Sequence, residues 1–106
     1  MQIAGSGHVT RAPRHAYHRP AQGLLGANPF EGEVENLSAS GAAVRLGDGG
    51  IVVDNGTFVD MHVEGLGRVR GNVARTYEGG FGLKFDDRGT DMAAVAQSLR
   101  HYNRLA

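Results

Sequence analysis

Residues 57–85, TFVDMHVEGLGRVRGNVARTYEGGFGLKF, alternate between apolar and polar side chains over three short stretches. An alternation with a period of two is typical of a strand that buries one face in a core. Gly79 and Gly80 supply a turn before the last stretch. The segment therefore predicts three consecutive antiparallel strands. The residues of their buried faces are Val59, Met61 and Val63, then Val69, Gly71 and Val73, then Phe81, Leu83 and Phe85.

The residues before this segment continue the pattern. Residues 30–36 (FEGEVEN) place three glutamates on one face and apolar residues on the other, and residues 42–46 (AAVRL) alternate again. Residues 24–25 predict a short strand, and an apolar piece over 51–54 lies between glycine-rich turns. In total the pattern predicts five or six antiparallel strands. Short, glycine-rich strands in this number tend to close into a small barrel.

The hydrophobic period changes after Arg88, because apolar residues then recur at a spacing of three and four. This is the period of an amphipathic helix. We expect the helix to run from about Asp91 to Arg104, with an acid in its first turn and a base in its last, where each complements the helix dipole. Its apolar stripe has to cover the barrel or a partner. The stripe consists of Met92, Val95, Ala96, Leu99 and Tyr102.

The composition bounds the class of protein. A length of 106 residues suits one domain, and 17 glycines are more than twice the average share of about 7%. There is no cysteine, which excludes disulfides, thiolate catalysis and Cys-ligated zinc. No apolar run is long enough to cross a bilayer, so we expect a cytoplasmic location and no transmembrane segment. Residues 1–10 predict a flexible leader, and 11–106 predict the single domain.

The charge and the motifs argue against several functions. The net charge is zero, so the global basic field of a DNA- or RNA-binding protein is absent, although residues 1–30 carry three arginines and no acid. The chain has neither a GxSxG elbow nor a phosphate-binding Walker loop. His15 and His18 lie close in the sequence, but no carboxylate accompanies them, and solvated or packed histidines are the simpler explanation of all five. We therefore expect neither an enzyme nor a metal site, and no cofactor other than a bound ligand.

Two polar stretches stand out from this background. The first, NLSASG at 36–41, offers an amide, a hydroxyl and a glycine at a strand break, which suits a nucleobase edge or a phosphate oxygen. A polar turn bonded to its own backbone is the simpler explanation of this stretch alone. The second, RAPRHAYHRP at 11–20, predicts an extended or turning basic arm whose guanidinium groups can fork onto phosphate or guanine. Alone, it is explained as well by a basic tail.

Taken together and in this order, the two stretches resemble the PilZ domain family of bacterial cyclic di-GMP receptors. The family carries an RxxxR motif and then [D/N]xSxxG about one strand later, and residues 36–41 match the second motif in full. Residues 56–86 are similar to the later strands of the family, with their FGLKF ending, and the helix after Phe85 also fits. The resemblance covers residues 11–104. It implies a mainly β fold, a six-stranded antiparallel barrel of the PilZ type with a C-terminal helix.

The resemblance also implies a site for cyclic di-GMP. Arg19 would be the second arginine of RxxxR, His15 stands where the family has the first, and Arg14 takes the preceding basic position. The arm would be a clamp that orders on the ligand, with its arginines on phosphates and guanine edges. In the second motif, Asn36 would bind a guanine edge, Ser38 would support phosphate or base, and Gly41 would let the backbone approach.

Two functions remain open. The first is a bacterial second-messenger receptor module that binds cyclic di-GMP through the arginine arm and the NxSxxG turn. The second is a degenerate PilZ adaptor that binds a protein partner and little or no nucleotide. The intact motif at 36–41 favours the first, whereas His15 favours the second, because a largely uncharged imidazole does not replace a guanidinium fork.

Overall fold

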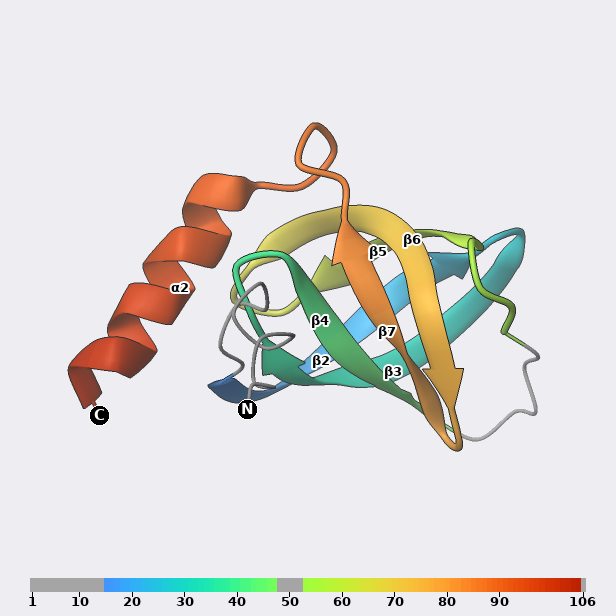
Figure 1. The fold of residues 1–106 in the computed structure, drawn as a ribbon, viewed down its shortest axis with the longest axis horizontal. Coiled ribbons are helices and arrows are strands. Elements are labelled where there is room, and N and C mark those ends of the chain that lie inside the picture. The colour runs from blue at the N-terminus through green and yellow to red at the C-terminus, as the bar shows by residue number, and fades with distance from the viewer. Residues whose placement is uncertain (1–14, 48–52, 106) are drawn as a thin grey trace, which may run out of the picture.

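The computed structural model describes residues 15–47 and 53–105, which form six antiparallel strands and one helix (Figure 1). The strands close into a barrel in the order β2-β3-β4-β7-β6-β5, because β2 pairs with β3 on one side and with β5 on the other. The predicted mainly β fold, with six antiparallel strands and a C-terminal helix, is therefore confirmed. The elements are β2 (His15–Leu25), β3 (Asn28–Leu37), β4 (Gly41–Leu46), β5 (Phe58–Val63), β6 (Gly67–Tyr77), β7 (Gly80–Phe85) and α2 (Met92–Leu105).

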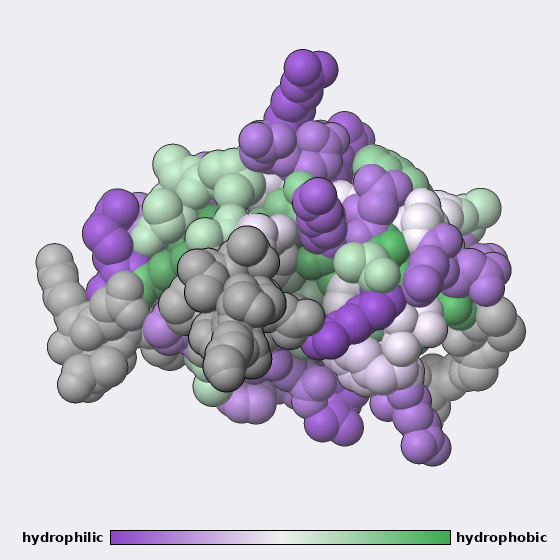
Figure 2. Space-filling view, viewed as in Figure 1, coloured by the Kyte–Doolittle hydropathy of each residue, from purple (hydrophilic) through white to green (hydrophobic). Residues whose placement is uncertain are grey.

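The core of the barrel consists of the residues that alternate inward along the strands. Phe81 is fully buried and meets Phe30 edge to face, with ring centroids 6.2 Å apart. The three predicted faces of 57–85 all point inward, and polar side chains project from the face of the molecule that Figure 2 shows. The period of two in the sequence thus identified the buried face of each strand.

Several glycines are required because neighbouring strands approach closely. A Cβ added at Gly71 would lie 2.0 Å from the carbonyl oxygen of Lys84, and one added at Gly32 would lie 2.3 Å from that of Arg45. No side chain fits at these distances, so glycine lets the strands coil tightly enough to close the barrel. Gly79, with a φ of 85°, instead forms the predicted turn between β6 and β7.

The start of the barrel differs from the prediction. A short strand around residues 24–25 was expected, preceded by an arm, but β2 is continuous over His15–Leu25. Pro20 does not interrupt it, because pairing with β5 begins only at Ala21, and a missing N–H costs little at a strand edge. The part of the arm from His15 onward is therefore a barrel strand. The leader at 1–10 and the arm residues 11–14 lie outside the described residues, as do 51–52 of the apolar piece.

The helix begins one residue later than predicted. Asp91 is its N-cap rather than part of its first turn, since the Asp91 carboxylate accepts the backbone N–H of Ala94 at 3.0 Å. Val95 is buried, and Met92, Ala94 and Leu99 are partly buried against the core. From this contact α2 leads away from the barrel instead of lying across it as a cap (Figure 1). The side chains of Tyr102 and Arg104 lie outside the described part.

The connection between the barrel and α2 is fixed on β6. The buried Thr90 hydroxyl accepts the backbone N–H of Arg70 at 3.0 Å and donates to the Arg70 carbonyl at 2.8 Å. Gly89 lies directly over the Arg70 side chain, since a Cβ there would come within 2.6 Å of Cδ. The direction in which α2 leaves is therefore set at Arg70.

Candidate ligand-binding site

The turn between β3 and β4 is held by the Ser38 side chain. Its oxygen accepts the backbone N–H groups of Gly41 at 3.1 Å and Ser40 at 3.3 Å, and its hydroxyl donates to the Gly41 carbonyl at 3.2 Å. The Ser38 N–H also donates to that carbonyl, at 2.9 Å. Ser38 is only 4% exposed. The hydroxyl therefore bonds to the backbone of its own turn, as the polar-turn explanation predicts, and it stabilises the motif.

We expect Ser38→Ala to lower the free energy of unfolding by about 1–2 kcal/mol, because it leaves the buried N–H of Gly41 without its acceptor. Chemical denaturation monitored by circular dichroism measures this. Ser40→Ala is the control, since Ser40 is exposed and contributes backbone groups only. Equal stability of the two variants would contradict the role assigned to the Ser38 hydroxyl.

Gly41 has a structural reason to be glycine. A Cβ added there would lie 2.2 Å from the carbonyl oxygen of Leu83 on β7. The strand contact alone therefore excludes a side chain at this position. Close approach of a ligand, the expected role of Gly41, is not needed to explain the residue.

Strand pairing brings the two sequence motifs together. His15 lies opposite Leu37, and Ala16 lies opposite Asn36, so the start of β2 runs beside the end of β3. The register then shifts, and Arg19 lies opposite Val34. His18 lies within this bulge at a φ of 52°, and its Nδ1 is 3.5 Å from the Glu33 carboxylate. His15, Arg19, Asn36, Ser38 and Gly41 thus gather at one end of β2, β3 and β4.

Arg19 is exposed, and its guanidinium lies over the buried ring of Tyr17, 5.9 Å from the ring centroid. Tyr17 was not among the predicted site residues, because the bulge at His18 interrupts the regular alternation between Tyr17 and Arg19, and the sequence does not indicate this bulge. Asn36 is half-buried and engaged in contacts of its own. Arg14 lies outside the described residues.

Among the described residues, three arginines of the barrel strands are paired with carboxylates, and two are not. Arg45 pairs with Glu35, and Arg68 and Arg70 both pair with Asp60. Hydrogen bonds from Arg68, and next from Arg70, lower the pKa of Asp60 to about 2. Over residues 15–47 and 53–105, no carboxylate pairs with Arg19 or Arg75. These two strand arginines keep their charge available for an anion.

Among the described residues, no three or more histidine, aspartate or glutamate side chains are grouped so that they could hold a metal ion. Among the same residues, no helix combines the length and the apolar character needed to span a bilayer.

Over the described residues, a closed barrel of six antiparallel strands followed by one helix defines the chain as a small, mainly β domain. A family model described as PilZ domain matches residues 9–102, which is most of the chain, and the protein belongs to this family. PilZ domains are generally receptor domains for cyclic di-GMP, not enzymes. A comparison with curated proteins found no match.

Proposed function

We propose that this protein is a cytoplasmic second-messenger receptor module that binds cyclic di-GMP at the junction of β2, β3 and β4. The observation that carries the proposal is the pairing of Ala16 with Asn36, which sets the cationic strand beside the NxSxxG turn. Membership of the PilZ family supports the choice of ligand.

The chemistry of the gathered residues suits a cyclic dinucleotide. The exposed Arg19 guanidinium can fork onto a phosphate or onto O6 and N7 of guanine, and the Tyr17 ring beneath holds it in place. Asn36 supplies an amide for a guanine edge. The Ser38 hydroxyl is engaged in the turn, so it positions the backbone of residues 38–41 for the ligand.

Much of the site is formed before the ligand arrives. An arm that ordered only on binding would lose about 1–2 kcal/mol of backbone entropy per residue. Residues 15–20 already belong to β2, so ligand binding does not have to order their backbone. The proposed mechanism therefore differs from a clamp in which the whole arm folds onto the nucleotide.

Isothermal titration calorimetry with cyclic di-GMP tests the proposal. We expect saturable binding to the wild-type chain and at least about tenfold weaker binding of cyclic di-AMP, because adenine lacks the O6 acceptor that pairs with arginine. Absence of saturable binding, or equal binding of both nucleotides, would contradict it.

The second candidate, a PilZ adaptor that binds a protein partner and little or no nucleotide, is favoured by one observation. His15 occupies the position of the first arginine, and the pairing of His15 with Leu37 keeps it in the site. His15→Arg distinguishes the candidates. If His15 is the residue that limits nucleotide binding, the His15→Arg variant binds cyclic di-GMP more tightly than wild type does. If it still fails to bind, the adaptor function becomes the better one.

A further inference from the structure

A row of paired residues leads from the proposed site across the outside of the barrel. Asn36 on β3 lies opposite Ala43 on β4, Ala43 lies opposite Gly82 on β7, and Gly82 lies opposite Arg75 on β6. Residues directly opposite each other in neighbouring strands point to the same face of the sheet. Since Ala43 and Gly82 are small, no long side chain of this row stands between Asn36 and Arg75.

The Arg75 side chain reaches back along this row. Its Cγ and Nε lie 3.1 and 3.2 Å from the position of a Cβ added at Gly82, so the side chain lies across β7. Neighbouring strands are about 4.8 Å apart, which leaves Arg75 roughly 10 Å from β3. Arg75 is exposed, and in the part of the chain that the structure describes it has no carboxylate partner.

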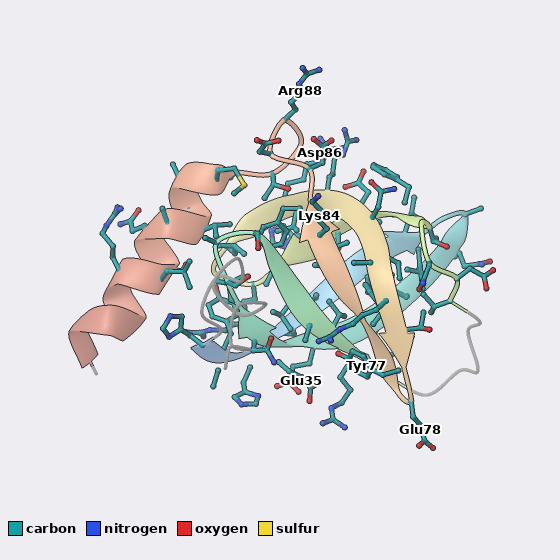
Figure 3. The ribbon with its side chains drawn as sticks, viewed as in Figure 1. Glu35, Tyr77, Glu78, Lys84, Asp86 and Arg88 are labelled. Carbon is teal, nitrogen blue, oxygen red and sulfur yellow. The ribbon has the colours of Figure 1, made fainter. Side chains whose placement is uncertain are left out.

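A second cation lies on the same outer face. Lys84 on β7 lies opposite Gly41, at the end of the NxSxxG motif, and it is exposed. Figure 3 shows Lys84 near the upper end of β7 and Tyr77 near the lower end of β6, with the glycine-rich middle of β7 between them. The Tyr77 ring lies on Gly80, since its Cε1 is 3.0 Å from an added Cβ. This face thus offers cations and an aromatic ring, the groups that bind phosphates and bases.

We propose that Arg75 is a further ligand-contacting residue of the cyclic di-GMP site, an inference that rests on the proposed function. Cyclic di-GMP carries two phosphates and two guanines, so one part of it can meet Arg19 and Asn36 while another meets Arg75. Arg19 and Arg75, the two strand arginines without an acid partner in the described residues, then contact the ligand from opposite sides of the NxSxxG turn.

Calorimetric titration of matched variants with cyclic di-GMP tests this contact. Arg75→Ala is expected to weaken binding by about tenfold or more, because a charge-assisted hydrogen bond is lost. Arg88→Ala removes the same charge from the exposed loop after β7 and is expected to change the affinity by less than about twofold. Arg75→Lys should fall between wild type and Arg75→Ala, since lysine keeps the charge but not the planar fork.

Gly82→Ala provides a test that keeps every charge. The atoms nearest to the added methyl group all belong to the flexible Arg75 side chain, so we expect it to displace the guanidinium and to leave the backbone in place. We expect weaker binding with an unchanged melting temperature. If Arg75→Ala binds cyclic di-GMP as tightly as Arg88→Ala does, while Arg19→Ala binds it weakly, Arg75 does not contact the ligand. The proposed function would then still stand. If the wild-type chain does not bind cyclic di-GMP, both are overturned.

Discussion

Arg19→Ala is expected to weaken the binding of cyclic di-GMP by about 100-fold or more. The guanidinium is exposed, rests on the Tyr17 ring and has no carboxylate partner in the described chain, so its full charge is available to the nucleotide. Two charge-assisted hydrogen bonds from one fork contribute about 1.5–3 kcal/mol each, and 1.4 kcal/mol corresponds to tenfold in affinity. Calorimetry on the purified variant measures the loss.

Neighbouring variants show whether the loss is specific. Arg19→Lys should recover part of the affinity, since it restores the charge without the fork. His15→Ala should cost less than Arg19→Ala, because only Arg19 is a permanent cation at a matched position of the motif. The melting temperature of Arg19→Ala should stay close to that of wild type, because an exposed cation–π contact contributes only about 0.5–1 kcal/mol. Equal and negligible effects of Arg19→Ala and His15→Ala would remove this part of β2 from the site.

Gly41→Ala is expected to destabilise the folded protein by about 2–3 kcal/mol in the absence of any nucleotide. The new methyl group would meet the Leu83 carbonyl oxygen at 2.2 Å, and this is backbone of a paired strand that cannot rotate away. Overpacking of this kind typically costs about 1–3 kcal/mol, and the rigidity of the contact places this case near the upper end. Denaturant unfolding measures the change.

Gly47→Ala is the matched control for this effect. A Cβ at Gly47 would lie 3.5 Å from the Glu31 carbonyl oxygen, an ordinary contact, so its stability should change by less than about 1 kcal/mol. If Gly41→Ala were as stable as Gly47→Ala but bound the nucleotide poorly, Gly41 would serve the ligand and not the strand contact.

The sequence predicted most of the barrel because its signals are local. The alternation over residues 57–85 marked the buried faces of β5, β6 and β7, and the change of period after Arg88 marked α2. The length of β2 was missed because Pro20 is a local signal against regular structure. Whether β2 can contain this proline depends on where its pairing with β5 begins, and that is a property of the assembled sheet.

The sequence indicated several residues that the strand pairing brings close together, but not what their side chains do in the fold. The motif at 36–41 indicated Ser38 and Gly41, yet their hydrogen bonds and the contact with Leu83 depend on a turn and on a strand more than forty positions later. Arg75 was not predicted, because its place in the same cross-strand row as Asn36 depends on the register of four strands. Spacing along the chain carries no information about such cross-strand rows.

The closure of the barrel also bears on how quickly the protein folds. Most strand pairs join neighbours in the chain, but β2 must find β5, with Ala21 opposite Val63, and β4 must find β7, with Gly41 opposite Lys84. A topology dominated by such distant pairings has a high contact order, and domains of this kind fold in about milliseconds to seconds. During synthesis, β2 emerges before β5, so residues 21–25 of β2 lack their β5 partner until Val63 has been made. The barrel therefore cannot close before residues of its second half have been made, and the pairing of Gly41 with Lys84 comes later still.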